Sequence, residues 1–136
     1  MRYRLVIFDM DGTLTEELLD FAAIRRDIGL PEEGGILEHM ARMEGEARAR
    51  AAGVLDAHEM AAAEICRLHE GAAEVLAALR QRGVLTALLT RNSRGCATRI
   101  LRRHGLSLDP VVTREDAPHK PHPDAILNIV RRTGMD

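Results

Sequence analysis

Three short apolar runs along the chain predict buried β-strands. Residues 5–8 read LVIF and run directly into acidic residues and an Asp-Gly turn signal, residues 84–90 read VLTALLT, and residues 111–113 form a weaker third run. Short apolar runs without polar alternation are typical of strands covered on both faces, as in a parallel sheet. The pattern therefore predicts a parallel sheet whose first strand is buried on both faces.

Amphipathic segments accompany these runs. A helix over about residues 71–82 is predicted to end at Gly83, in the position where a glycine often terminates a helix. The segment 94–105, RGCATRILRRHG, keeps apolar residues at helical spacing up to its closing glycine. Pro123 opens a last helix, which Gly134 ends. This order of strands and helices predicts an α/β open sheet with right-handed crossovers.

The segment from residue 15 to about residue 70 does not fit a simple crossover. It is rich in Ala, Glu and Arg and is far longer than a strand-helix-strand connection needs. PEEGG at residues 31–35 and Gly53 divide it into three predicted helices. Their shared apolar face is predicted to include Phe21, Ile24 and Ile28. The segment is either a surface insertion or a lid over the end of the first strand, and its position after the acidic turn favours the lid.

The composition changes this picture little. With 136 residues, of which 46% are apolar and 29% charged, the chain suits one soluble globular domain. A formal net charge of -2 gives no reason to expect nucleic acid or an anionic membrane as a partner. Cys66 and Cys96 are interpreted as buried thiols of a reducing compartment, and the N-terminal apolar run is too short for a signal peptide. We therefore predict a cytoplasmic protein.

Polar residues follow each predicted strand at its carboxyl end. Ligands of parallel α/β sheets bind beyond these ends, so the side chains are expected to converge on one rim. Carboxylates, hydroxyls and the single lysine of the chain are among them. The residues are Asp9, Asp11, Gly12 and Thr13 after the first strand, Thr90, Arg91 and Asn92 after the second, and Glu115, Asp116, His119 and Lys120 after the third.

The two aspartates favour phosphate chemistry. Carboxylates one residue apart repel each other unless a cation lies between them, and Mg²⁺, which prefers oxygen ligands, fits that need. One carboxylate can attack phosphorus while the other moves protons, and Gly12 lets backbone N–H groups turn toward phosphate oxygens. Each signal also has a plain structural explanation: a turn for Asp-Gly, a strand end for Thr90 and a solvated side chain for Lys120. Their combination points to phosphate.

The motifs DMDGTLT, LLTRN and HKPHP, in this order and at strand ends, resemble those of the haloacid dehalogenase-like hydrolase superfamily. The resemblance covers essentially the whole chain and is to phosphatases with a helical cap after the first motif, similar to phosphoglycolate phosphatases. It implies a three-layer, Rossmann-like core at residues 1–14 and 71–136 and a small helical cap at residues 15–70. An acid at position 11 implies phosphoryl transfer rather than carbon–halogen cleavage.

By matching position, the resemblance assigns roles to the motif residues. Asp9 would be the nucleophile that becomes an aspartyl-phosphate, and Asp11 would be the general acid and base. The Asp9 carboxylate and the Asp11 backbone carbonyl would bind Mg²⁺. Thr90 would donate a hydrogen bond to the phosphoryl group, and Lys120 would offset the negative charge on Asp9 and on the phosphate. Asn92 would add a contact from its backbone amide to the phosphoryl group. The remaining candidates for phosphate binding are Gly12, Thr13 and Arg91.

One motif of the family does not occur in the sequence. An acidic turn after a fourth strand completes the Mg²⁺ shell in the family, whereas this chain ends at TGMD, residues 133–136. Asp136 comes at a helix end, too early to replace that turn. We therefore interpret the core as C-terminally incomplete, with an open edge on the first strand. From this we expect homodimer formation through that edge and little phosphatase activity in a chain that ends here.

Three other functions remain open. A phosphomutase of the same superfamily would need the cap to hold a sugar phosphate in two orientations, which nothing in residues 15–70 specifies. A receiver domain would carry its phosphorylated aspartate after the third strand, but the DGTLT turn and the long insertion do not fit it. The third is an inactive module with this fold. The expected substrate is a small phosphorylated metabolite, and the cap arginines that are candidates to bind its second anionic group are Arg25, Arg26, Arg42, Arg48 and Arg50.

Overall fold

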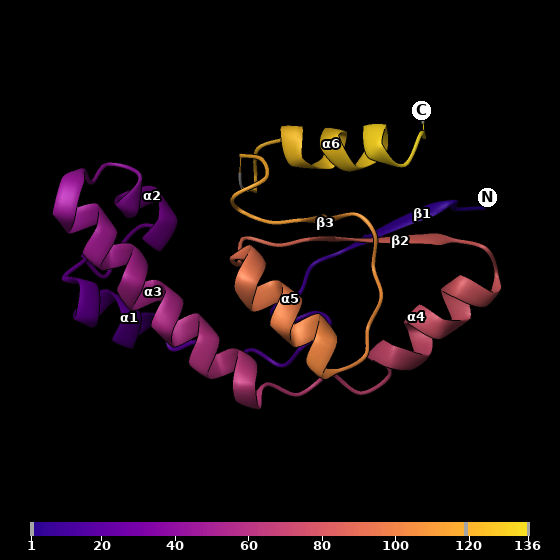
Figure 1. The fold of residues 1–136 in the computed structure, drawn as a ribbon, viewed down its shortest axis with the longest axis horizontal. Helices are drawn as coiled ribbons and strands as arrows, with labels where there is room; N and C mark the ends of the chain where they lie inside the picture. The colour runs from indigo at the N-terminus through magenta and orange to yellow at the C-terminus, as the bar shows by residue number, and fades with distance from the viewer. Residues whose placement is uncertain (1, 119, 136) are drawn as a thin grey trace. The chain divides into compact units, whose positions relative to one another are not determined.

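Three parallel strands form a sheet in the computed structural model of this protein, which describes residues 2–118 and 120–135. Both strand pairs are parallel, so the carboxyl ends of the strands meet at one edge of the sheet (Figure 1). His119 and Asp136 lie outside the described residues. The strands, in the spatial order β1-β2-β3, are β1 (Leu5–Phe8), β2 (Leu85–Leu89) and β3 (Val111–Val112).

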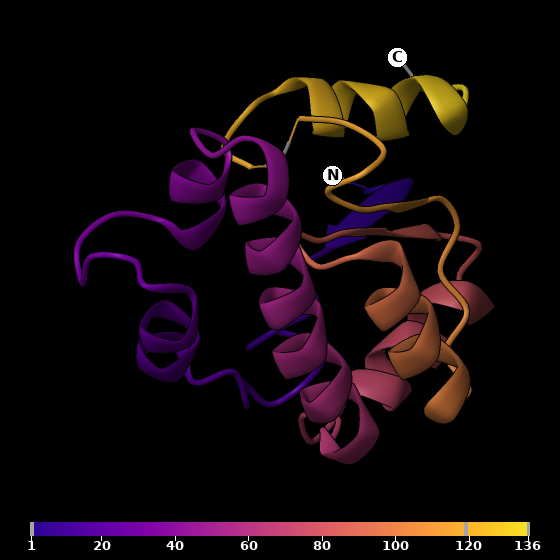
Figure 2. The same ribbon diagram turned by 60° about the vertical axis from the view of Figure 1, so that its left-hand side comes forward.

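Helices cover both faces of this sheet. The helix α6 (Asp124–Arg132) lies on one face, and α4 (Ala72–Gln81) and α5 (Arg94–Arg103) lie on the other (Figure 1, Figure 2). The parallel sheet between two helical layers confirms the predicted three-layer α/β fold. Side chains of β2, β3 and α6 form a core cluster of buried residues: Ala87, Leu89, Val112, Ala125 and Ile129.

The helices around the sheet end where the sequence predicted. Gly83 follows α4 with a φ of 69°, and Gly105 follows α5 with a φ of 63°. These values lie in the left-handed region, which side chains with a Cβ rarely adopt. Pro123 precedes α6 as its N-cap residue and therefore lies one position before the helix that it was predicted to begin. Glycine positions and apolar spacing together located these helices.

The first strand is less buried than predicted. All four residues of β1 are only partly buried, whereas Ala87 and Leu88 of β2 have no exposed surface. Among the described residues, β1 pairs only with β2, so one of its edges is not covered by another strand. The prediction of full burial was wrong for β1 because burial depends on the neighbours of a strand in space, which an apolar run does not specify.

Residues Leu18–Ile65 form a separate helical unit, and the other unit comprises Met1–Glu17 and Cys66–Asp136. The core of the helical unit contains Ile24, Ile36 and Leu55. The assignment of this region as a cap, with the bounds 15–70, stays a prediction. No helix in the described part of the chain has the length and apolar character of a membrane span. The helices of the unit are α1 (Phe21–Ile28), α2 (Ile36–Met40) and α3 (Gly45–Ile65).

Two details of the predicted helical segment are corrected. Gly53 does not divide two helices but lies inside α3, and the break before α3 falls after α2 instead. A glycine in a helix costs only about 1 kcal/mol relative to alanine, which the alanine-rich sequence around it can offset. Phe21 is 41% exposed, whereas Ile24 is fully buried, so the two do not share a buried face.

Replacing Gly53 by alanine is expected to raise the free energy of unfolding by about 0.5–1 kcal/mol, because a Cβ reduces the freedom of the unfolded chain and favours the helix. A Cβ at this position would meet no atom within 4 Å. Denaturant unfolding of the purified protein measures the change. Gly83→Ala is the matched control and is expected to destabilise, because its φ is 69°. A loss of stability in Gly53→Ala would contradict the expectation.

Candidate active site

The turn after β1 carries Asp9 and Asp11 to the edge of the sheet. Met10 between them has no exposed surface, and its carbonyl oxygen accepts backbone N–H groups from residues 13–15 at 2.9 to 3.1 Å. Gly12 has a φ of 77°, which lets the chain reverse immediately after Asp11. The buried methionine anchors the turn, with the exposed Asp9 on one side of it and the partly buried Asp11 on the other.

Asp9 forms an ion pair with the only lysine of the chain. Lys120 Nζ lies 2.9 Å from Asp9 Oδ1, and the two side chains are 32% and 45% exposed. The same oxygen accepts the Met10 backbone N–H at 2.8 Å. Lys120 follows β3 and Asp9 follows β1, so the fold brings together two residues that the resemblance placed in one site.

Asp11 lies in a different environment from Asp9. It is partly buried, and Asn92 Nδ2 donates a hydrogen bond to Asp11 Oδ2 at 3.3 Å. Burial raises the pKa of Asp11, and the negative charge of Asp9 raises it further, whereas the hydrogen bond from Asn92 opposes the rise. The exposed Glu17 adds a smaller upward effect on the pKa of Asp11. Asp11 therefore holds a proton more readily than an ordinary aspartate.

The turn after β2 supplies Thr90 and Asn92. Both are buried, with 2% and 4% of their surface exposed. Thr90 Oγ1 accepts the Asn92 backbone N–H at 3.0 Å, so the amide that was predicted to contact a phosphoryl group already has a partner. The sequence did not predict the contact of the Asn92 side chain with Asp11. A polar residue directly after a strand was the only signal for it.

The other candidates for phosphate binding, Gly12, Thr13 and Arg91, are less buried than Thr90 and Asn92. Gly12 and Thr13 are exposed, and their backbone N–H groups donate within the turn, to Thr15 at 2.8 Å and to Met10 at 3.1 Å. Arg91 is partly buried, and its carbonyl oxygen accepts a hydrogen bond from a neighbouring guanidinium group at 3.3 Å. Phosphate binding by Gly12, Thr13 and Arg91 stays a prediction.

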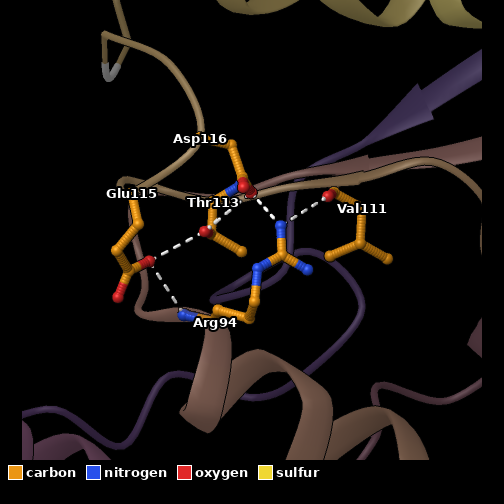
Figure 3. Close-up of polar contacts among 5 residues, drawn as sticks. All are labelled: Arg94, Val111, Thr113, Glu115 and Asp116. Carbon is orange, nitrogen blue, oxygen red and sulfur yellow. Dashed lines mark hydrogen bonds and ion pairs between the residues drawn. The ribbon is translucent and has the colours of Figure 1, made fainter.

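The side chains of Glu115 and Asp116 contact Arg94, the first residue of α5, and Thr113 instead of joining Asp9 and Asp11. With Arg94 and Thr113 they form a cluster that we call the clasp (Figure 3). Glu115 Oε2 accepts the Arg94 backbone N–H at 3.0 Å and the Thr113 hydroxyl at 2.8 Å. Asp116 Oδ2 accepts the Thr113 backbone N–H at 2.8 Å and forms an ion pair with the Arg94 guanidinium.

The clasp also fixes the protonation of Asp116. Burial alone would raise the pKa of Asp116, but the hydrogen bonds from Thr113, together with the hydrogen bond and positive charge of Arg94, lower it below its usual value. Asp116 is therefore ionised and occupied by structural contacts. Nothing in the sequence pattern indicated these contacts, because Arg94 belongs to a different segment of the chain.

The donor set at the two aspartates suits a hard cation. Two carboxylates converge there, and the raised pKa of Asp11 reflects, after burial, repulsion from Asp9 that a cation would relieve. Carboxylate and backbone carbonyl oxygens are ligands that Mg²⁺ accepts. Within residues 2–118 and 120–135 no group of three or more His, Cys, Asp or Glu side chains has the arrangement of a metal site. Asp9 and Asp11 thus fit Mg²⁺ as part of a ligand set.

Comparison with known proteins places this arrangement in a family. A chain from Arabidopsis thaliana described as a haloacid dehalogenase-like hydrolase domain-containing protein is 30% identical over 94% of this chain and 57% of its own length. A phosphoserine phosphatase from Halobacterium salinarum is 37% identical over 79% of this chain and 54% of its own. The crystal structure of a hydrolase from Pseudomonas syringae superposes with a TM-score of 0.79 at 22% identity, over 99% of this chain and 71% of that one.

The coverage and identity of these matches decide which conclusions they support. The chain spans about half the length of these two curated relatives, and the structural match, at 22% identity, establishes the fold alone. The family model described as haloacid dehalogenase-like hydrolase, in contrast, matches residues 3–136. The chain therefore belongs to the haloacid dehalogenase-like hydrolase family.

Proposed function

We propose that this protein is a Mg²⁺-dependent phosphatase that hydrolyses a small phosphomonoester through an aspartyl-phosphate at Asp9. The observation that carries the proposal is the difference between the two aspartates. Asp9 is exposed and paired with Lys120, whereas Asp11 is partly buried with a raised pKa. An exposed carboxylate held by a cation suits a nucleophile, and a partly buried carboxyl group with a raised pKa suits a general acid. The family membership and the related phosphoserine phosphatase support the same reaction class.

In the first step, Asp9 attacks the phosphorus atom of the substrate. Asp9 Oδ1 is held by Lys120 and by the Met10 N–H, and Oδ2 has no hydrogen-bond partner among the described residues, which leaves Oδ2 to attack. The bond from phosphorus to the leaving oxygen breaks as the new bond to Asp9 forms. Asp11 gives its proton to the leaving oxygen, so the product is a neutral alcohol.

In the second step, water cleaves the aspartyl-phosphate. Asp11, now a carboxylate, takes a proton from the water as the water oxygen attacks phosphorus. The bond from phosphorus to Asp9 breaks, which releases inorganic phosphate and restores the Asp9 carboxylate. Lys120 offsets negative charge on the phosphoryl group in both steps, as a cation near a developing charge does. Asn92 orients Asp11 through its side-chain amide.

Mg²⁺, when bound, would neutralise negative charge on the phosphoryl group. The Asp9 carboxylate and the Asp11 backbone carbonyl are the groups of this chain proposed to hold it. The substrate class is a small phosphorylated metabolite, and the proposed cap at residues 15–70 would select among such molecules. Location in the cytoplasm and dimer formation remain predictions.

The phosphomutase and the receiver domain are less well supported. In a receiver the phosphorylated aspartate directly follows the third strand, but Thr113 occupies that position here, and Asp116 is bound within the clasp. A mutase would return the phosphoryl group to a sugar rather than to water. Product analysis separates the mutase from the phosphatase, because only the phosphatase releases inorganic phosphate.

The proposal is tested on the full-length protein that contains these residues. A panel of small phosphomonoesters, with p-nitrophenyl phosphate as a generic substrate, is incubated with Mg²⁺, and inorganic phosphate is measured. We expect phosphate release that stops with EDTA and returns when Mg²⁺ is restored. Absence of release from every member of the panel with Mg²⁺ present would overturn the proposal, and activity that persists in EDTA would overturn its metal dependence.

A further inference from the structure

The clasp supports the first turn of α5 and the buried threonine after β3. The Arg94 backbone N–H is one of the helix-terminal donors that has no partner within its own helix, and Glu115 supplies a negatively charged acceptor for it. Thr113 is 1% exposed, and its N–H and hydroxyl both donate to clasp carboxylates. The Arg94 guanidinium also donates to the Val111 carbonyl at 3.3 Å (Figure 3). The clasp thus satisfies polar groups of two separate segments at once.

The loop between β3 and α6, which carries Thr113, Glu115 and Asp116, connects the clasp to both sides of the candidate active site. The Arg114 backbone N–H donates to the Asn92 carbonyl at 3.3 Å, and Arg114 Nη1 donates to the Arg91 carbonyl at 3.3 Å. Asn92 in turn contacts Asp11. In the other direction, Lys120 comes four residues after Asp116 and reaches Asp9. The clasp therefore lies at the base of the loop that presents Lys120.

We propose that Arg94 is a positioning residue that acts through the clasp to hold the loop after β3 so that Lys120 reaches Asp9. In the loop between β3 and α6, the described residues 113–118 and 120–123 belong to no helix or strand, so an unanchored loop would place Lys120 in many conformations. A charged group that must meet a reacting phosphate is effective only when it is held in place before the reaction. The importance of this role for turnover rests on the proposed phosphatase function.

The acylation rate of the single lysine measures this positioning directly and does not depend on catalytic turnover. Lys120 is the only lysine of the 136-residue sequence, and its acylation by an amine-reactive ester can be followed by mapping the peptide that contains it. Loss of the clasp should free Lys120 from Asp9 and increase its rate of acylation. We expect Arg94→Met to increase the rate by about two- to fivefold, the range that a partly exposed ion pair is worth. Asp9→Asn, which removes the partner of Lys120 itself, gives the reference for a released lysine.

The matched control is Arg102→Met, which removes an exposed arginine from the same helix outside the clasp and should leave acylation unchanged. Arg94→Lys keeps a positive charge for Asp116 and should restore part of the protection. Asp116→Asn preserves the shape of the side chain and serves as a second clasp variant if Arg94→Met does not fold. Wild-type acylation rates in folded Arg94→Met, or in Asp116→Asn where the former does not fold, would overturn the positioning role.

Turnover supplies a second and separate readout. Arg94→Met is expected to lower kcat by roughly tenfold, because small displacements of a catalytic group are costly, but to have no further effect in a Lys120→Ala background. Additive losses in the double variant would overturn the role, since they would show that Arg94 acts independently of Lys120. If the wild type has no phosphatase activity while acylation still responds to Arg94→Met, the proposed function fails and the positioning role stands.

Discussion

Asp9→Asn is expected to lower the phosphatase kcat by about 10⁴-fold or more, because an amide cannot form the covalent phosphoryl intermediate. The side chain keeps its shape, and the lost ion pair with Lys120 joins two partly exposed groups, so the folded state should change little. Steady-state release of phosphate from p-nitrophenyl phosphate measures the loss. Mass spectrometry of protein quenched during turnover should find a phosphoryl group on the wild-type peptide that contains Asp9 and none on the variant.

Asp109→Asn is the matched control for this substitution. It makes the same chemical change at an exposed aspartate that precedes β3, at the opposite end of the strand from the candidate site. Its activity should equal that of the wild type. Asp9→Asn with activity within tenfold of the wild type would show that Asp9 is not the nucleophile, whatever the rate of the wild-type enzyme.

Asp11→Asn is expected to lower kcat/KM by about 10²- to 10⁴-fold for an alkyl phosphate, the usual contribution of a general acid. The loss should be much smaller for p-nitrophenyl phosphate, because nitrophenolate leaves without needing a proton. The partial burial and raised pKa of Asp11 fit a group that carries a proton to the leaving oxygen. Measuring kcat/KM for both substrates on wild type and variant gives the comparison.

The same variant makes a second, independent readout available. Without Asp11 the attacking water lacks its base, so the aspartyl-phosphate should accumulate and p-nitrophenol should appear in a burst. Rapid-quench kinetics detects that burst. Equal losses for the two substrates would contradict the role of Asp11 as proton donor, and absence of a burst would contradict its role as base in the second step.

The strands and helices around the sheet could be predicted because their signals are local. The apolar run before Asp9 determines a strand, and Gly83 determines where α4 ends because the required φ is costly for any residue with a Cβ. Gly53 shows the limit of the same reasoning. A glycine inside an alanine-rich stretch signals a break, but the helix-forming residues around it outweigh its cost, and α3 continues through it.

The candidate site was partly predictable because its signals, too, are local in the sequence. The sequence located Asp9, Asp11, Thr90 and Asn92 at the carboxyl ends of strands, and parallel strands present those ends at one edge of a sheet. It did not predict which of these residues would contact one another. Asn92 was expected to contribute its backbone amide, whereas its side chain reaches Asp11, a residue 81 positions away.

Local sequence was enough to predict the strands around the site, the ends of the helices and the place of the two aspartates, because periodicity and backbone preference act over a few neighbouring residues. The partial burial of β1, the contact of the Asn92 side chain with Asp11 and the contacts of the clasp became visible only in the packed fold. Each of these depends on which distant segments pack together. A hydrogen bond between such segments leaves no pattern in the local sequence, because a residue such as Arg94 is equally suited to solvent on an exposed helix.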